Sequence, residues 1–390
     1  MLGDYDLIVV GSGFTGAVIA HMAAKRLKRR VLILEKRGHI AGNMYDEKDP
    51  ETGILVQKYG PHSFHTDDPQ VFELIREIGE WEPFVLRARA EVLGRLTPSP
   101  FNLQTIEDYF HPSKALEIKT HLVNEFSYRP KVTILEMLRS RDTVVREYAD
   151  FLFGQDYRPY TAKQWGIAPE DLDISVLQRV PVRLSYIDQY FDDRYQMQPK
   201  GGYTALFEKL LADEKIEVRL STDACRHLEL KEDGTVRMDG ETVNVPIVYS
   251  GALDELFQCK YGKLPYRSLF FEYKVMPTSD FQPTPGVAYP LAEGYTRITE
   301  FSKLMPLPPE TEKTIVAYEY PEKYGSERGK EAYYPILTAD SQRLYQRYLG
   351  EAGKYPMLYP CGRLGDFKYY NMDQAIKRAV ELFEELPLRG

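Results

Sequence analysis

Residues 6–35, DLIVVGSGFTGAVIAHMAAKRLKRRVLILE, decide the fold. A short apolar run leads into Gly11-x-Gly13-x-x-Gly16, a helix-like segment follows, and a second apolar run ends at an acid, Glu35. Strand, glycine turn, helix, strand and acid in this order form the dinucleotide-binding fingerprint. Gly11 allows the turn, Gly13 lets the backbone approach a pyrophosphate, and Gly16 lets the helix pack closely on the strand. A glycine turn in a nucleotide-free α/β domain is the alternative, and the two strands and the acid disfavour it.

The residues around these glycines complete a predicted cofactor site. The start of the helix would direct free N–H groups and a partial positive charge toward the phosphates. Glu35, 19 residues after Gly16, lies where a carboxylate would accept hydrogen bonds from a ribose. The other cofactor contacts predicted from this region are Phe14, Thr15, Lys36, Gly42 and Asn43.

Two later segments help to distinguish FAD from NAD. Residues 196–260 contain a glycine turn, an amphipathic helix and two more apolar strands. Residues 358–390 contain a strand, a glycine loop and a final helix that begins near 371–373. Three separated segments that return to one nucleotide-binding sheet are typical of FAD-dependent oxidoreductases. The junction before the last helix would offer N–H groups to a flavin, which adds Met372 and Asp373 to the predicted contacts.

The middle of the chain predicts further structure, and the fold class is α/β (α+β multidomain). Apolar periodicity over 69–81, 113–126 and 133–152 indicates amphipathic helices. Aromatic and β-branched alternation in YRSLFFEYKVMP, GVAYPLAEGYTRITEF and KTIVAYEYP indicates an antiparallel sheet. We expect a discontinuous Rossmann-like FAD-binding domain, a helical insert and an antiparallel β-sheet domain, with ligands in the cleft among them. The FAD-binding domain is predicted to comprise residues 1–68, 196–260 and 358–390. The helical domain is predicted to comprise 69–82 and 103–178, with a mobile loop at about 166–181. The antiparallel sheet domain is predicted to comprise 83–102, 179–195 and 261–357.

Composition narrows the class of protein. The 390 residues are 43% hydrophobic and 28% charged, as in ordinary globular proteins, and the net charge of −8 argues against nucleic-acid binding. Three scattered cysteines (Cys225, Cys259 and Cys361) disfavour a disulfide framework and favour a reducing cytoplasm. No apolar run approaches about 18 residues, so we expect neither a membrane span nor a signal peptide.

Arginine and aromatic residues indicate a site for an anion. Arg179 ends a polar loop, and Arg297 lies within EGYTRITEF, where a charged residue in a half-buried strand needs a partner. Two guanidinium groups from separate elements suit a diphosphate. The aromatic residues predicted near them are Tyr157, Tyr160, Trp165 and Tyr190, on which a base could stack. Pairing of Arg297 with Glu300, or burial of Tyr160 in a core, remains an alternative.

Two histidines, His62 and His65, follow a Gly-Pro turn in QKYGPHSFHTDD. Their spacing could serve a metal, but no neighbouring cluster of His, Cys or acidic residues supplies further ligands. We therefore predict no metal. The open alternatives are a structural role in the interior and a role in shaping the flavin environment, including proton relay.

The chain resembles UDP-galactopyranose mutases of the prokaryotic type. The segments that carry the resemblance run from residue 11 to about 377. They are GSGFTGAV, LEKRGHIAGNMYDE, YGPHSFHT, PFNLQTI, YTAKQWG, GGYTALF, YRSLFFE, GYTRITEF, YYPI and GRLGDFKYYNMDQAI.

The resemblance implies roles for particular residues. Arg179 and Arg297 would clamp the diphosphate, and His62 and His65 would lie close to the flavin. Further residues matching the family are Tyr190, Tyr334 and Tyr369 at the phosphates, Tyr160 and Trp165 at the uridine and sugar, and Arg363 and Asn371 beside the flavin. The family commonly has a phenylalanine pair where this chain has Asp156-Tyr157.

The resemblance also implies an activity, the redox-neutral interconversion of UDP-galactopyranose and UDP-galactofuranose for cell wall polysaccharide biosynthesis. In the family, N5 of reduced FAD bonds the anomeric carbon as UDP leaves, and the sugar ring then recloses through O4. The partners so implied are the two sugar nucleotides, a reductant such as NAD(P)H, and further copies of the chain. The alternatives are an FAD-dependent oxidase or desaturase of the amine-oxidase type, with an apolar tunnel, and a non-catalytic flavin- or UDP-sugar-binding protein.

Overall fold

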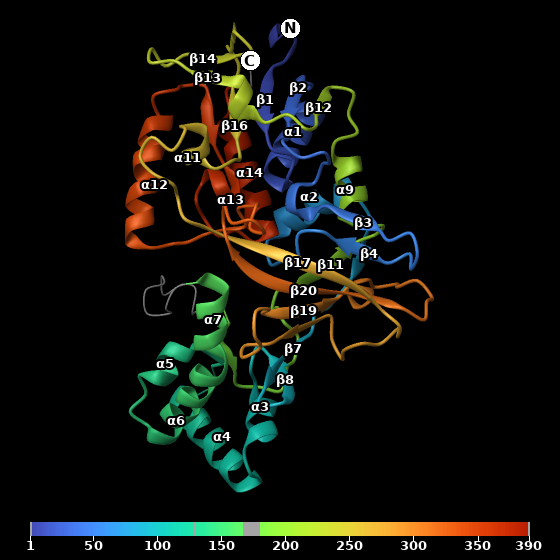
Figure 1. Ribbon diagram of the computed structural model, residues 1–390, viewed down its shortest axis with the longest axis vertical. Helices are drawn as coiled ribbons and strands as arrows, with labels where there is room; N and C mark the ends of the chain where they lie inside the picture. Colours follow the sequence, from blue (N-terminus) through green and yellow to red (C-terminus); the bar gives the residue numbers. More distant parts are fainter. Residues whose placement is uncertain (1, 128, 167–179, 389–390) are drawn as a thin grey trace.

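The computed structural model describes residues 2–127, 129–166 and 180–388. Three groups of elements follow one another along its longest axis (Figure 1). A parallel sheet with its helices lies at one end, a long antiparallel sheet lies in the middle, and a cluster of helices lies at the other end. The predicted mixed α/β class is confirmed.

The first group is built on a five-stranded parallel sheet. Its strands, in spatial order, are β12 (Ile216–Arg219), β2 (Val31–Leu34), β1 (Leu7–Val10), β16 (Ile247–Tyr249) and β22 (Leu358–Pro360). All four pairings are parallel. Every residue of β1, β2 and β16 is buried, because helices or small sheets cover both faces. These short apolar runs therefore read as continuous strings in the sequence.

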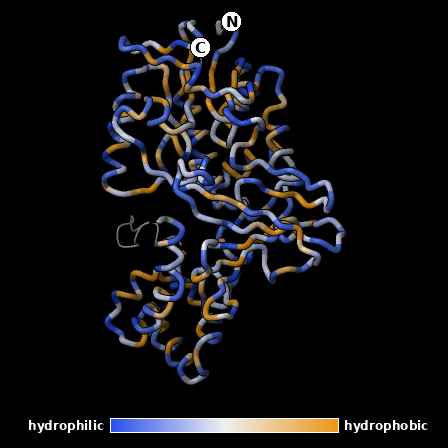
Figure 2. The backbone as a smooth tube through the Cα atoms, viewed as in Figure 1, coloured by the Kyte–Doolittle hydropathy of each residue, from blue (hydrophilic) through white to orange (hydrophobic). Residues whose placement is uncertain are grey.

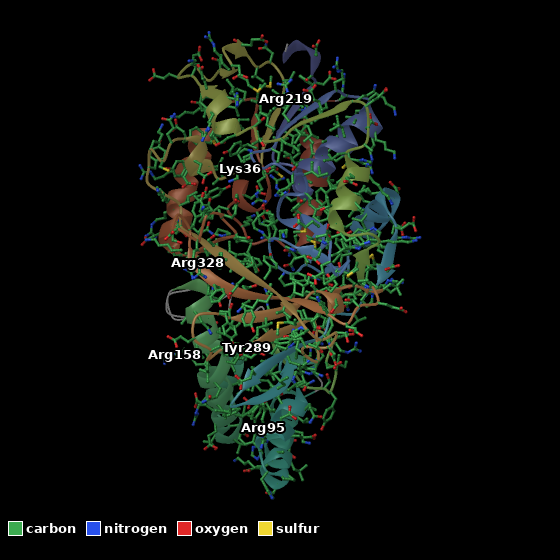
Figure 3. The ribbon with its side chains drawn as sticks, turned by 45° about the vertical axis from the view of Figure 1, so that its right-hand side comes forward. Lys36, Arg95, Arg158, Arg219, Tyr289 and Arg328 are labelled. Carbon is green, nitrogen blue, oxygen red and sulfur yellow. The ribbon has the colours of Figure 1, made fainter. Side chains whose placement is uncertain are left out.

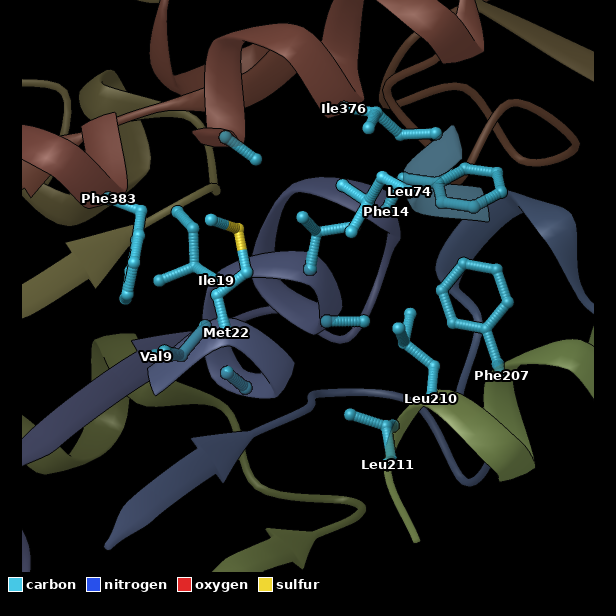
Figure 4. Packing of buried hydrophobic residues seen from close by; sticks show 14 of the residues in the cluster. Val9, Phe14, Ile19, Met22, Leu74, Phe207, Leu210, Leu211, Ile376 and Phe383 are labelled. Carbon is cyan, nitrogen blue, oxygen red and sulfur yellow. The ribbon is translucent and has the colours of Figure 1, made fainter. Parts of the chain in front are cut away.

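The two faces of this sheet carry separate apolar cores. Val9 and Ile33 face α1 (Phe14–Leu27), α9 (Tyr203–Leu210) and α14 (Met372–Glu385), whose side chains interlock in Figure 4. Ile8 and Leu32 face α11 (Leu253–Leu256), α12 (Ala339–Ala352) and a small sheet of β13 (Leu228–Leu230), β14 (Val236–Met238) and β15 (Glu241–Thr242). Alternate residues of one strand thus enter different cores, as the pleat requires.

Two helices pack where the sequence did not place them. We expected 69–82 in the helical domain, but Val71, Leu74 and Ile75 of α2 (Pro69–Ile78) belong to the core around α1. Similarly, α12 lies within the expected sheet domain, yet Tyr345 and Tyr348 enter the core on the other face of the parallel sheet. An apolar stripe shows which face of a helix is buried, but it does not show what covers that face.

The middle group is a seven-stranded sheet. Its strands, in order, are β21 (Tyr334–Pro335), β17 (Tyr266–Met276), β20 (Thr314–Lys323), β19 (Arg297–Glu300), β18 (Gly286–Ala288), β7 (Ala88–Val92) and β8 (Arg95–Ser99). All neighbours run antiparallel except β18 and β7. The three aromatic segments predicted as strands are confirmed as β17 to β20. A separate sheet of β5 (Phe64–Thr66), β11 (Tyr195–Pro199) and β6 (Trp81–Pro83) lies beside it.

The third group contains α3 (Leu103–Tyr109), α4 (Pro112–Phe126), α5 (Ile134–Leu138), α6 (Thr143–Leu152) and α7 (Arg158–Trp165). Apolar and polar stretches alternate along these helices (Figure 2), and their apolar sides form one core. The single helix predicted over 133–152 is two helices. Asp142 accepts hydrogen bonds from the backbone N–H groups of Val144 (2.9 Å) and Val145 (3.2 Å), which starts a new helix there.

Candidate active site

A cleft of about 220 Å³ opens at the carboxyl ends of β1, β2, β16 and β22, where open parallel sheets bind ligands. The predicted cofactor contacts that line it are Gly11, Gly13, Phe14, Thr15, Glu35, Lys36, Gly42, Asn43, Arg363 and Met372. Lys36 is labelled in the upper part of Figure 3. Asn371, predicted at the substrate, also lines this cleft. Gly16 and Asp373 do not line it.

Two glycines show why this cleft needs its sequence. A Cβ atom on Gly16 would lie 2.0 Å from the carbonyl oxygen of Gly11, so Gly16 sets the close packing of α1 on the strand. Gly42 has φ of +54°, and a Cβ atom there would lie 3.0 Å from Cα of Gly13. The turn after β2 therefore approaches the glycine turn after β1 backbone to backbone. No side chain caps α1 at Gly13, so its first N–H groups face the cleft.

Glu35 is held at the end of β2 by three hydrogen bonds. Its carboxylate accepts from the N–H of Ser12 (2.9 Å), the hydroxyl of Ser12 (2.7 Å) and the N–H of Arg37 (2.9 Å). The side chain is 5% exposed and lines the cleft. Two carboxylate oxygens offer about four acceptor sites, so capacity remains for about one ribose hydroxyl.

Arg37 is a cleft residue that the sequence reasoning missed. Its Nη2 donates to Asn43 Oδ1 (3.0 Å) and contacts Glu331 Oε2 (2.5 Å), and the guanidinium lies 4.2 Å from the ring centre of Tyr59. Burial alone would lower the pKa of Arg37, but Glu331 raises it overall. Its buried Nε has no hydrogen-bond partner within the described residues. A second basic residue directly after Lys36 was the available signal.

A second cavity, of about 320 Å³, lies between the antiparallel sheet and the helical segment formed by residues 153–157 and α7. The predicted residues that the structure brings together here are His62, Tyr157, Tyr160, Tyr190, Arg297, Tyr334 and Tyr369. Arg179 lies outside the described residues, as does nearly all of the loop predicted at 166–181. Trp165 ends α7.

Arg297 is a cation that lines this cavity, and it pairs with Glu319. The two residues are directly opposed on β19 and β20, and Nη2 of Arg297 contacts Oε2 of Glu319. Burial would lower the pKa of Arg297, but the carboxylate of Glu319 raises it. Its buried Nε has no partner among the residues that the structure describes. The alternative partner Glu300 instead accepts hydrogen bonds from the backbone of Phe281 and Gln282.

Two stacked tyrosines of the second cavity lie against Arg363, which lines the cleft. The rings of Tyr334 and Tyr369 are 5.0 Å apart and inclined by only 8°, and both line the second cavity. Arg363 lies 5.4 Å from the ring centre of Tyr334 and 5.6 Å from that of Tyr369, and it lines the cleft. Arg363 is fixed by donating to the carbonyl oxygens of Tyr333 (3.3 Å) and Tyr370 (2.9 Å). Ligands in the two cavities would therefore be neighbours.

His62 lines the second cavity and is uncharged at neutral pH. Burial, together with the charges of Arg363 and Arg297, lowers its pKa to about 3. Gln57 and Gln198 hold its backbone, and its Nδ1 is buried without a partner among the described residues. Near pH 7 the imidazole therefore presents an uncharged hydrogen-bonding surface to the cavity.

His65 points elsewhere. It lines neither cavity; its Nδ1 lies 3.0 Å from Asp193 Oδ2, and its ring stacks on Phe191 at 3.5 Å. The alternation of side chains along a strand applies only within the strand. His62 precedes β5 and His65 lies within it, so the spacing of the two histidines does not predict that their side chains face the same direction. His65 is corrected to a packing residue. Asp373 likewise faces Thr66, at 3.4 Å, instead of the cleft.

The described residues contain no group of three or more His, Cys, Asp or Glu that could hold a metal ion. Within the same residues, no helix combines the length and apolarity needed to cross a membrane.

α7, which carries Tyr160, is fastened to the antiparallel sheet at two points. The ammonium of Lys163 donates to the carbonyl oxygens of Tyr289 (2.8 Å), Ala292 (2.7 Å) and Tyr295 (2.7 Å). Tyr289 is labelled in Figure 3. Arg267 of β17 donates to the carbonyl oxygen of Gln164 (3.0 Å) at the end of the helix. These contacts fix the wall of the second cavity.

Comparison with known proteins agrees with this arrangement. The family model for UDP-galactopyranose mutase matches residues 156–369, and a model for NAD(P)-binding Rossmann-like domains matches residues 9–78. The UDP-galactopyranose mutase of Mycoplasma pneumoniae is 33% identical over 386 residues, which cover 98% of this chain and 96% of that protein. The chain belongs to the UDP-galactopyranose mutase family. The resemblance seen in the sequence is thus confirmed, and the chain is an enzyme of the isomerase class.

A relative named for another sugar nucleotide is also similar to this chain. The dTDP-fucopyranose mutase of Escherichia coli is 32% identical to this chain over 378 residues, 96% of each protein. A crystal structure of reduced UDP-galactopyranose mutase has the same fold, with a TM-score of 0.72 at 16% identity, covering 98% of this chain and 93% of that one.

Proposed function

We propose that the protein interconverts UDP-galactopyranose and UDP-galactofuranose, with FAD bound in the cleft and the sugar nucleotide in the second cavity. The observation that carries the proposal is the guanidinium of Arg297, in a cavity whose Tyr334 and Tyr369 rings lie against Arg363 of the dinucleotide cleft. A sugar nucleotide needs a cation at its diphosphate and a reactive partner at its sugar, and this adjacency offers both.

The cleft fits FAD in several respects. The uncapped N-terminus of α1 and the close approach of Gly42 to Gly13 suit a pyrophosphate. Glu35 would hold the ribose, and Arg37, with its partnerless Nε, would add a donor to the phosphates. When bound in reduced form, FAD would supply an electron-rich N5 nitrogen able to bond the anomeric carbon. Electrons would come from a reductant such as NAD(P)H.

The protein's own part is electrostatic and positional. Arg297 would donate hydrogen bonds to the diphosphate and balance the charge that grows on it as the bond to the sugar breaks. Glu319 holds this guanidinium in place before the substrate arrives. The hydroxyl groups of Tyr160, Tyr190 and Tyr334 line the same cavity and would donate to phosphate or sugar oxygens. Neutral His62 would complete the lining beside the sugar.

The lining argues against an oxidase of the amine-oxidase type. Such an enzyme would present an apolar tunnel, whereas this cavity carries Arg297, Arg89 and Glu319 among its tyrosines. The same proposal includes three further roles: Arg179 completes the diphosphate clamp, Trp165 contacts the ligand, and the protein acts in the cytoplasm as a homo-oligomer.

The direct test is turnover by the FAD-loaded protein. Under anaerobic conditions, we expect UDP-galactofuranose to be converted to UDP-galactopyranose only when dithionite is present, as measured by anion-exchange chromatography. Separate aerobic reactions without dithionite should show no steady oxygen consumption. Parallel reactions with dTDP-fucose would reveal the specificity of the E. coli relative. Absence of exchange with UDP-galactofuranose under reducing conditions would refute the proposal, and steady oxygen consumption would favour the oxidase.

A further inference from the structure

Asp156 is a carboxyl group in the second cavity, and it has no partner among the residues that the structure describes. It lies in the π-helical turn Phe153–Tyr157 before α7. Residues 156, 157, 160, 161 and 164 all line the cavity, and this spacing is one face of a helix. Asp156 makes no hydrogen bond or ion pair within residues 2–127, 129–166 and 180–388. Burial raises its pKa to about 7, and no cation of the described ranges acts against this effect.

An acid that lines a cavity without a partner among the described residues indicates a ligand. The side chain of Asp156 is partly exposed, so its oxygens are accessible from the cavity. Neighbouring cavity residues do not occupy these oxygens. Arg89 binds Asp188 instead, at 3.4 Å, and Thr161 and Gln164 make no hydrogen bond with the Asp156 carboxyl among the described residues.

The position of Asp156 along the cavity identifies the part of the ligand that would reach it. Both Arg297 and Asp156 are close enough to Tyr160 for their charges to act on its hydroxyl, whereas Arg297 has no such effect on Asp156. At the other end, His62 experiences the charges of both Arg297 and Arg363, beside the cofactor cleft. The order is therefore His62, Arg297, Tyr160, Asp156. If the protein has the proposed function, the sugar lies beside His62, the diphosphate beside Arg297 and the base beside Asp156.

The chemistry of the base then selects the protonation state of the acid. The exposed edge of uracil or thymine presents an N3–H donor beside carbonyl acceptors. An uncharged carboxyl group has one acceptor and one donor, which match N3–H and a neighbouring carbonyl in a pair of hydrogen bonds. An ionised carboxylate would accept from N3–H but would oppose the carbonyl lone pairs.

The surroundings also favour the uncharged form. The titratable groups that the charge of Asp156 reaches are Tyr109 of α3, Tyr157 and Tyr160, and burial raises the pKa of all three. These phenols stay protonated, and they supply neither a cation nor a base to hold a carboxylate. Tyr190 lines the same cavity. The diphosphate would further disfavour a negative charge at Asp156.

We propose that Asp156 selects the nucleobase of the sugar nucleotide by pairing, as an uncharged carboxyl group, with the imide edge of uracil or thymine. This assignment rests on the proposed function. It explains how an acid can occupy a position where the family commonly has an aromatic residue, because hydrogen bonding to the edge of the base would compensate for lost stacking.

The test compares UDP with 3-methyl-UDP, which lacks the N3–H. Titration calorimetry with the FAD-loaded full chain would measure both affinities for the wild type, Asp156→Ala, Asp156→Asn and the control Asp150→Asn, which changes an exposed acid of α6. We expect the wild type and Asp150→Asn to prefer UDP by at least about tenfold. Asp156→Ala should bind both alike. Asp156→Asn, which keeps one acceptor and one donor, should retain the preference.

The pH dependence tests the protonation state. In the wild type the preference for UDP should narrow from pH 6 to pH 8, whereas Asp156→Asn should show a constant preference. Comparing the two ligands cancels the titration of their phosphates. Equal wild-type affinities, a preference that survives in Asp156→Ala, or a preference that widens with pH would overturn the inference. Failure of UDP to bind the wild type at all would instead overturn the proposed function.

Discussion

Replacing Arg297 by alanine should affect both the stability of the fold and the binding of the diphosphate, because the same guanidinium serves both. The change leaves Glu319, whose side chain is 2% exposed, with the hydroxyl of Thr296 at 3.3 Å as its remaining side-chain donor. Breaking a buried pair in this way costs about 3–5 kcal/mol of stability. Loss of two charge-assisted hydrogen bonds to the diphosphate, each worth about 1.5–3 kcal/mol, should also reduce kcat/KM by about 10²–10⁴-fold.

The double variant Arg297→Ala/Glu319→Gln distinguishes the two effects. Neutralising Glu319 removes the buried charge, so most of the lost stability should return, as measured by urea unfolding. Activity should not return, because the cation is still missing. Arg87→Ala, which removes an arginine that is 53% exposed in its pair with Asp188, is the control and should change unfolding by less than about 1 kcal/mol. Wild-type turnover in Arg297→Ala, or recovery of activity in the double variant, would refute the reasoning.

Three further predictions follow from other contacts. His62 has a native pKa of about 3 against about 6.5 when unfolded, so protons bind the unfolded chain preferentially below pH 6.5. The free energy of unfolding should therefore fall as the pH decreases from 7 to 5, by up to about 1.4 kcal/mol per pH unit. Urea titrations of His62→Gln should show a smaller change of this free energy with pH. An identical change in the wild type and the variant would contradict the predicted role of His62. Gly42→Ala should weaken retention of FAD, measured by flavin absorbance after gel filtration, because its Cβ would press on Gly13. Gly94→Ala, also at positive φ but with nothing within 4 Å, should retain the flavin, and equal retention in both variants would count against a close cradle. Lys163→Met should cost about 2–3 kcal/mol of stability, since three carbonyl oxygens lose a charged donor. Lys200→Met, which breaks an exposed pair with Glu80, is the matched control and should be nearly neutral; similar losses in both would argue against the Lys163 anchor.

The cofactor cleft was the most predictable part of the molecule. Gly11, Gly13 and Glu35 are consecutive parts of one local motif, so spacing alone fixes their relative positions. Arg37 was missed because the motif ends at the acid, Glu35, and does not specify the residue two positions later. Its contact with Glu331 joins residues 294 positions apart, which no local pattern contains.

The second cavity was predictable only in its residue types. Arg297 required a partner, but choosing Glu319 over Glu300 depended on the register between β19 and β20, which the sequence leaves open. His65 was misplaced because two histidines three positions apart can face different directions when a strand begins between them. Asp156 was noticed as a departure from the family, yet its lack of a partner emerged only from the structure.

The split construction of the parallel sheet bears on how the protein is made. The cleft combines Gly11 near the start of the chain with Met372 near its end, and β22 pairs with β16 only when residues 358–360 are available. A ribosome adding about 5–20 residues per second needs roughly 20–70 s to pass from one to the other. During that interval the nascent N-terminal half has no finished pocket, so we expect flavin to be captured only after synthesis is nearly complete, and chaperones to shield the waiting apolar strands.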